Sequence, residues 1–329
     1  MTKTLAFVLI TILLTVSCDT AETKRDRFFL QGNVALNARE HRQAITHFSN
    51  ALTVDPDFAL AYKNRGVALM EAARPFEAIQ DYNQAILIQP DYWEAIYNRA
   101  NAYEVTKQYP KSLRDIEFLL NEFPDSITFE FFKGLVYTQM DSLKKAADTF
   151  EKVWNQDGTN IEALINWATV LYYQTDYQAA IKLLEEAVEI DPSQANAFNT
   201  MNQLLGDVGD HRKALQAVNK ALDIDRSNPI FLNNRGYTYL MLDSLRLAIQ
   251  DINASLVRDP DNMWAFRNKG IYFLKTGDYD QAERYLKQVI EASDYAPNTY
   301  TYLAEVYQQQ GEVEKAKVTL SKEKQGHIH

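Results

Sequence analysis

Hydrophobic residues recur along most of the chain at helical spacing, in paired stretches separated by short polar turns. Between residues 59 and 92, the stretches 60–72 and 76–88 carry apolar side chains three and four positions apart. The same pair returns in a frame of 34 residues that begins at Arg25 and repeats at 59, 93, 127, 161, 195, 229, 263 and 297 without an insertion. The pattern predicts an all-α chain of about nine helical hairpins.

Three columns of residue types share this frame. Position 20 is alanine in eight of the nine units, and Ser112 occupies it in the remaining one. Position 8 is glycine, alanine or asparagine throughout, and five units have proline at position 32. Small residues at positions 8 and 20 predict that the two helices of a hairpin cross closely. The Asp-Pro pairs at 55–56, 191–192 and 259–260 predict the ends of units.

This 34-residue frame, with small residues at positions 8, 20 and 27 and proline at 32, resembles the tetratricopeptide repeat family. The resemblance covers residues 25–329 and implies a right-handed superhelical solenoid. The array is expected to stop with the ninth unit, because the column at position 28 is apolar in the first eight units and becomes Lys324 in the last.

The N-terminal residues form a separate segment. Residues 5–16 are apolar apart from two threonines, and this run suits the core of a secretory signal better than a membrane-spanning helix. It ends at Ser17-Cys18, which resembles the lipobox of bacterial lipoproteins. The expected organisation is a signal peptide over 1–17, a lipidated Cys18 with a linker over 18–24, and the repeats. The alternative is an ordinary signal with an incidental cysteine. The resemblance implies acylation, palmitate included, and anchoring in the bacterial cell envelope, at the periplasmic face of the outer membrane.

Charge and the inventory of reactive residues narrow the function. Hydrophobic residues make up 46% of the chain, and the net charge is −10, which disfavours nucleic acid as a partner. The five histidines and one cysteine form no metal-binding spacing, and neither a phosphate-binding loop nor a nucleophile elbow occurs. We therefore expect no cofactor, no metal and no enzymatic activity.

Arginine at position 7 and aspartate at position 23 occur together in three units. No unit without arginine at position 7 has aspartate at 23. This co-occurrence predicts ion pairs between the two helices of a hairpin, and we favour a structural role over an anion-binding site for them. The predicted pairs are Arg65 with Asp81, Arg99 with Asp115, and Arg235 with Asp251.

In the family, first helices line the inner, concave surface, with positions 2, 5, 9, 12 and 13 pointing into it. Here these positions combine aromatic rings and amides with few charges, which suits an extended peptide or a helix. The alternative is that some rings only pack between repeats. Lys63 and Arg267 match part of the family's clamp for a terminal carboxylate, but position 9 is Val67 and Ile271, so that ligand is not expected. The predicted groove residues are Phe29, Asn33, Lys63, Tyr97, Asn101, Phe131, Tyr172, Tyr173, Asn233, Tyr237, Trp264 and Arg267.

Together these features predict a membrane-anchored scaffold that binds envelope proteins or peptides in its groove. The alternative is a structural lipoprotein that self-assembles into homo-oligomers and binds no peptide.

Overall fold

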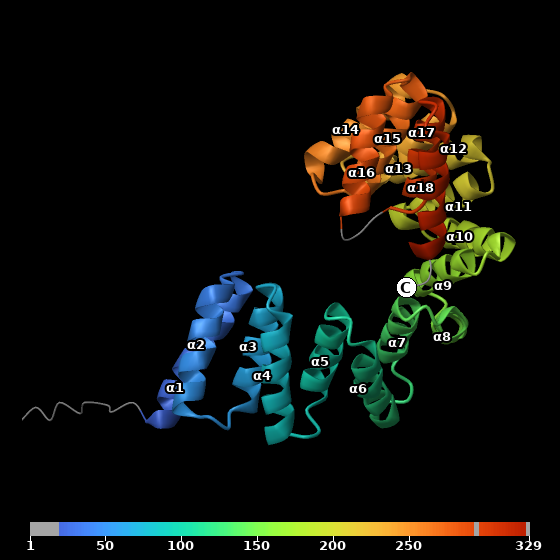
Figure 1. The fold of residues 1–329 in the computed structure, drawn as a ribbon. Coiled ribbons are helices and arrows are strands. Elements are labelled where there is room, and N and C mark those ends of the chain that lie inside the picture. Colours follow the sequence, from blue (N-terminus) through green and yellow to red (C-terminus); the bar gives the residue numbers. More distant parts are fainter. Residues whose placement is uncertain (1–19, 293–295, 327–329) are drawn as a thin grey trace, which may run out of the picture. The chain divides into compact units, whose positions relative to one another are not determined.

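The computed structural model describes residues 20–292 and 296–326, which form eighteen α-helices and no β-strand (Figure 1). This confirms the all-α repeat fold and the predicted number of hairpins. The chain divides into two compact units, one ending at Met140 and the other beginning at Asp141. The division falls in the turn of the fourth repeat, so each unit is described separately.

Unit 1 contains the first seven helices, each packed against its neighbours in sequence. First and second helices of successive repeats alternate along it (Figure 1). The helices are α1 (Ala21–Asn37), α2 (His41–Val54), α3 (Ala59–Glu71), α4 (Pro75–Ile88), α5 (Trp93–Val105), α6 (Tyr109–Glu122) and α7 (Ile127–Gln139).

Unit 2 continues the alternation with eleven helices. Besides sequential neighbours, successive first helices also touch, as α9 touches α11 and α11 touches α13. The helices are α8 (Leu143–Gln156), α9 (Ile161–Tyr173), α10 (Tyr177–Ile190), α11 (Ala195–Asp207), α12 (His211–Ile224), α13 (Pro229–Met241), α14 (Leu245–Arg258), α15 (Met263–Thr276), α16 (Tyr279–Glu291), α17 (Thr299–Gln309) and α18 (Val313–Gly326).

The small residue at position 8 makes room for a large side chain at position 24. Gly66 lies against Tyr82, whose ring is 1% exposed, and a Cβ at Gly66 would come within 2.5 Å of that ring. Where position 8 is Ala100, position 24 is the smaller Ile116, which is also fully buried. The hairpin core thus depends on a size match between its two helices.

The turn inside each hairpin contains a left-handed residue that the sequence analysis missed. Position 15 has positive φ in all nine units, although only three of these residues are glycine. Three of these turns also carry a helix cap: Asp176, Asp210 and Asp278 each accept a hydrogen bond from a backbone N–H in the first turn of the following helix. Pro75 is the first residue of α4, where its missing N–H costs little.

The N-terminal end of the array differs from two expectations. Helix α1 begins at Ala21 and not at Arg25, because Thr20 caps it by accepting from the backbone N–H of Thr23. The linker predicted over 18–24 is therefore largely helical. At the other end, helix α18 extends to Gly326. Cys18 and the signal segment lie outside the described residues. Among the described helices, none has the length and apolarity needed to cross a membrane.

Candidate functional site

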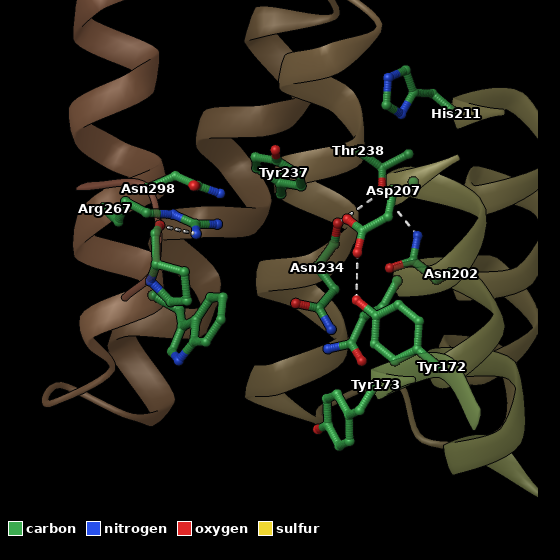
Figure 2. Close-up of a pocket in the computed structure, with 14 residues that line it drawn as sticks. Tyr172, Tyr173, Asn202, Asp207, His211, Asn234, Tyr237, Thr238, Arg267 and Asn298 are labelled. Atoms are coloured by element: carbon green, nitrogen blue, oxygen red, sulfur yellow. Dashed lines mark hydrogen bonds between the residues drawn. The ribbon is translucent and has the colours of Figure 1, made fainter. Parts of the chain in front are cut away.

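A pocket of about 290 Å³ lies on the first helices of unit 2 (Figure 2). Helices α9, α11, α13 and α15 contribute most of its walls, and the segment before α17 adds two residues. Six of the predicted groove residues come from this half of the chain, and five of these line the pocket. The lining residues are Tyr172, Tyr173, Asn202, Gln203, Gly206, Asp207, His211, Asn234, Tyr237, Thr238, Trp264, Arg267, Pro297 and Asn298.

One side of the pocket is built around Tyr172 and Asp207. The Tyr172 hydroxyl donates to Asp207 Oδ2 at 2.5 Å, joining α9 to α11. Burial, together with this hydrogen bond to a carboxylate, raises the pKa of Tyr172 well above its usual range, so the phenol stays protonated. Tyr173 lies beside it with 57% of its surface exposed. This side therefore offers an acidic group and an accessible ring.

The floor of the pocket is a network of buried polar groups. The Asn202 amide donates to the Ala214 carbonyl at 3.0 Å and to Thr238 Oγ1 at 2.9 Å. Thr238 in turn donates to the Asn234 carbonyl, and the Asn234 amide donates to Asn199 Oδ1 at 2.8 Å. Because each of these bonds fixes a side chain, the floor is rigid before any ligand arrives.

Arg267 forms the opposite side, and only 6% of it is exposed. Its guanidinium lies 4.8 Å from the centre of the Trp264 ring and 5.2 Å from that of Tyr237. It donates from Nε and Nη2 to Asn268 Oδ1, and from Nη1 to the Pro297 carbonyl at 2.9 Å. Burial lowers the pKa of Arg267 because the cation loses water, whereas nearby tyrosines and Asp207 act in the opposite direction.

Asn233 was predicted to face a ligand, but it is 3% exposed and does not line the pocket. It accepts a hydrogen bond from the Asn268 amide at 2.8 Å, and Asn268 holds Arg267. Asn233 therefore supports the wall behind the arginine. Tyr237 has both roles, because it lines the pocket and its hydroxyl lies 3.3 Å from that of Tyr302.

The groove residues predicted in unit 1 are not gathered in a comparable pocket. Phe29 packs against Phe48 and Phe58 with ring centres 5.7 and 5.0 Å apart. All three rings belong to the first repeat, so Phe29 is part of the packing of the core. Tyr97 packs in the same way on Phe129 and Phe132, 5.6 Å from each. For these two rings the contacts favour the alternative, in which some of the predicted groove rings pack in the core.

Of the remaining unit 1 residues of the predicted groove, only Asn101 is readily accessible. Asn33 accepts from the Asn64 amide at 2.7 Å, whereas Asn101 is exposed. Lys63 is partly buried, and burial lowers the pKa of its amine. Phe131 of α7 is also partly buried.

Each predicted ion pair is present with two parallel hydrogen bonds. Arg65 Nε and Nη2 donate to the two oxygens of Asp81 at 2.7 Å, and the other two pairs repeat this geometry at 2.7–3.0 Å. A 250 Å³ hollow adjoins Arg65 and Asp81, but the arginine in it is already paired with a carboxylate. The geometry supports the structural role for these pairs.

A further partner of these arginines was missed from the sequence. The free Nη1 of each arginine donates to position 25 of the preceding repeat: Ser49 for Arg65, Asn83 for Arg99, and Asn219 for Arg235, at 2.8–3.1 Å. The arginine thus links two repeats as well as two helices. A signal existed, because position 25 is serine or asparagine before each of these units and glutamate before the fourth, fifth and sixth.

Lys269 is a basic residue at position 7 in a unit that has no aspartate at position 23, and it has a different partner. Its amine lies 5.1 Å from the centre of the Tyr285 ring, and Tyr285 occupies position 23 of that unit. A cation–π contact therefore replaces the ion pair there. Among the described residues, no cluster of three or more potential metal ligands occurs.

Comparison with known proteins agrees with this architecture. Models of the tetratricopeptide repeat match residues 29–96, 159–227, 203–262 and 273–322, which together span about two thirds of the chain. The chain belongs to the tetratricopeptide repeat family. Its fold is accordingly that of a scaffold for protein–protein interaction. No curated protein sequence matches the chain significantly.

Solved structures share the fold at low sequence identity. A tetratricopeptide repeat protein from Parabacteroides merdae is 16% identical with a TM-score of 0.68, covering 76% of this chain and 99% of its own. The Cut9-Hcn1 hetero-tetramer of the APC/C gives 15% and 0.62, covering 93% and 74%. The pilF protein of Pseudomonas aeruginosa gives 18% and 0.51, covering 64% and 96%.

Proposed function

We propose that the chain is a lipid-anchored adaptor of the bacterial cell envelope, and that the pocket of unit 2 binds a polypeptide segment of an envelope protein. The composition and position of the pocket support this proposal. It combines exposed rings (Tyr173 and Trp264) with amides held in fixed positions, and it lies on the first helices of successive repeats. Rings supply apolar contact area, and fixed amides satisfy peptide groups.

The anchor rests on the N-terminal sequence. The apolar run ends at Ser17-Cys18, and α1 begins at Ala21, which leaves two residues between the cysteine and the first helix. Acyl chains on Cys18 would hold the repeats directly at the periplasmic face of the outer membrane, since each buried methylene contributes about 0.8 kcal/mol. An adaptor tethered in this way concentrates its partner at the membrane.

The binding part is tested by recovering partners from envelope extract. The test variant is Tyr172→Ala/Tyr173→Ala/Tyr237→Ala, and the matched control is Gln178→Ala/Gln216→Ala/Gln250→Ala, which changes three exposed residues on the second helices of the same unit. The control is expected to recover the same proteins as wild type, and the test variant to lose them. Equal recovery by all three would refute the pocket as the binding site.

The anchor is tested separately by fractionation of cells grown with labelled palmitate. Cys18→Ala is expected to lose the label and to leave the membrane fraction, whereas Thr11→Ala, which keeps the cysteine, is expected to retain both. Retention of Cys18→Ala on membranes would refute the lipid anchor without affecting the pocket.

Self-assembly is the second candidate, because the first repeat has an open face. Leu30 and Val34 of α1 are 64% and 63% exposed. Position 10, which Val34 occupies, is buried in later repeats, as at Ala68, Ala102 and Leu204. Two copies of the chain could cover this face. Light scattering over a concentration series measures the mass of wild type and of Leu30→Glu/Val34→Glu. Self-assembly predicts an oligomer for wild type and a monomer for the variant, whereas a monomeric wild type would refute it.

A further inference from the structure

We infer that the pocket of unit 2 selects a polypeptide segment carrying one acidic side chain, whose carboxylate pairs with Arg267, and that Asp207 rejects a second acidic side chain beside it. This inference rests on the proposed function, because it requires a polypeptide in the pocket. Figure 2 shows the two charged groups entering from opposite sides, Arg267 from α15 and Asp207 from α11, with Tyr237 of α13 between them.

The hydrogen bonds of Arg267 leave part of its donor set free. A guanidinium has five N–H groups, and the three hydrogen bonds that Arg267 donates use one each from Nε, Nη1 and Nη2. Two N–H groups remain, one on each terminal nitrogen. Such a pair of terminal nitrogens matches the two oxygens of a carboxylate, which binds a guanidinium through parallel hydrogen bonds.

Arg267 also forms no ion pair with any described residue, and Asp207 attracts its charge only from across the pocket. Arg65, Arg99 and Arg235 are less buried, and each pairs with an aspartate in its own hairpin. Arg267 is more buried than any of them, yet its acceptors are an amide and a carbonyl oxygen, and its other neighbours are two ring faces. A buried cation without a counter-ion is costly, so a carboxylate arriving with a ligand gains more here than at a surface arginine.

Asp207 limits what else the ligand carries. Its Oδ2 accepts from Tyr172, and the residue remains exposed at the pocket lining. A carboxylate in this position attracts a hydrogen-bond donor or a cation and repels a second acid placed beside the first. The two walls together favour an acidic side chain flanked by neutral or basic residues over an acidic run.

The test uses the full chain and an array of N-acetylated peptides fixed through their C-termini, so that no peptide carries a free terminal carboxylate. The central residue is glutamate, glutamine, lysine or phosphoserine, and its neighbours are neutral, basic or acidic. Wild type is expected to bind central glutamate about tenfold or more better than central glutamine, as for one charge-assisted pair. It is also expected to bind less when a second glutamate adjoins the first.

Three variants test whether Arg267 and Asp207 are responsible for the two expected preferences. Arg267→Gln is expected to abolish the preference for glutamate, whereas Arg246→Gln, which removes an exposed arginine of α14, is expected to keep it. Circular dichroism checks that Arg267→Gln is folded. Asp207→Asn changes an exposed residue and is expected to remove the penalty for a second glutamate, so the inference remains testable if Arg267→Gln does not fold.

Asp294 lies outside the described residues, three positions before Pro297, and is tested directly. If Asp294→Asn raises glutamate binding tenfold, the chain itself supplies the carboxylate and the inference fails. Peptide binding with equal affinity for glutamate and glutamine overturns the inference while leaving the proposed function intact. Binding only by peptides with a free C-terminus, or a preference for phosphoserine alone, also overturns it. Failure of every peptide to bind refutes the proposed function as well.

Discussion

Replacing Gly66 by alanine sets two opposing effects against each other, and the structure indicates which dominates. Alanine in a helix interior is favoured over glycine by about 1 kcal/mol. However, the new Cβ would lie 2.5, 2.8 and 2.9 Å from three atoms of the Tyr82 ring. That ring is 1% exposed, so it has no free space to move into. Overpacking of this kind costs about 1–3 kcal/mol.

Three simultaneous close contacts place the cost in the upper half of that range. We expect Gly66→Ala to lower the free energy of unfolding by about 1–2 kcal/mol. Urea unfolding followed by circular dichroism measures the change, and hydrogen exchange of the α3 and α4 amides shows whether it is local. In a Tyr82→Leu background the same substitution is expected to stabilise the hairpin, because the pairing of Ala100 with Ile116 shows that alanine fits a smaller partner. An identical effect in both backgrounds would refute the steric reasoning.

Three further substitutions test other contacts. Thr175→Gly is expected to stabilise unit 2 by about 0.5–1 kcal/mol in thermal unfolding, because the β-branched residue has φ 64° and the equivalent Gly209 already meets the left-handed requirement. Arg235→Lys is expected to destabilise by about 1 kcal/mol, since lysine cannot keep both bonds to the aspartate and the bond to the preceding repeat, and Arg246→Lys serves as its control. For Glu283, burial raises the pKa, but hydrogen bonds from Lys287 and Tyr307 outweigh it and leave the pKa below the ordinary 4.5. Its contribution is therefore complete above pH 4.5 and lost as the pH falls through the lowered value, so Glu283→Gln should flatten the acid limb of a stability–pH profile.

The repeat frame was predictable because it depends only on the regular spacing of residue types along the chain. Second helices begin at position 17 in all nine units, and seven first helices begin at position 1. The left-handed turn at position 15 was not predictable from residue type, since Thr175 and Asp243 occupy it in some units and glycine in others. The helix ends on both sides hold the residue in that conformation. The stability of the rest of the hairpin offsets the energetic cost of the left-handed backbone.

The site was predictable only in part, for a related reason. Position in the repeat indicated which side chains lie on first helices, but it did not indicate how far each one is buried. Asn233 and Arg267 occupy the same repeat position, yet the first supports the wall and the second lines the pocket. Asn202 was missed because it occupies position 8, which falls outside the family's inward-facing set. Asp207 occupies position 13, which belongs to that set, but it was not included among the predicted groove residues.

The pocket includes a segment in which the repeat departs from its own pattern. Helix α17 begins at Thr299, two residues later than its frame, after a left-handed Asn298 that no other first helix has at its cap. The shifted segment presents the Pro297 carbonyl to Arg267, and arginine occurs at position 5 in this unit alone. A ninth repeat that followed the regular frame would not present the Pro297 carbonyl to Arg267. An irregular junction and a buried cation without an aspartate each weaken a stack built for stability. Their occurrence together, on the helices that carry the rings, supports the proposal that this pocket binds a ligand.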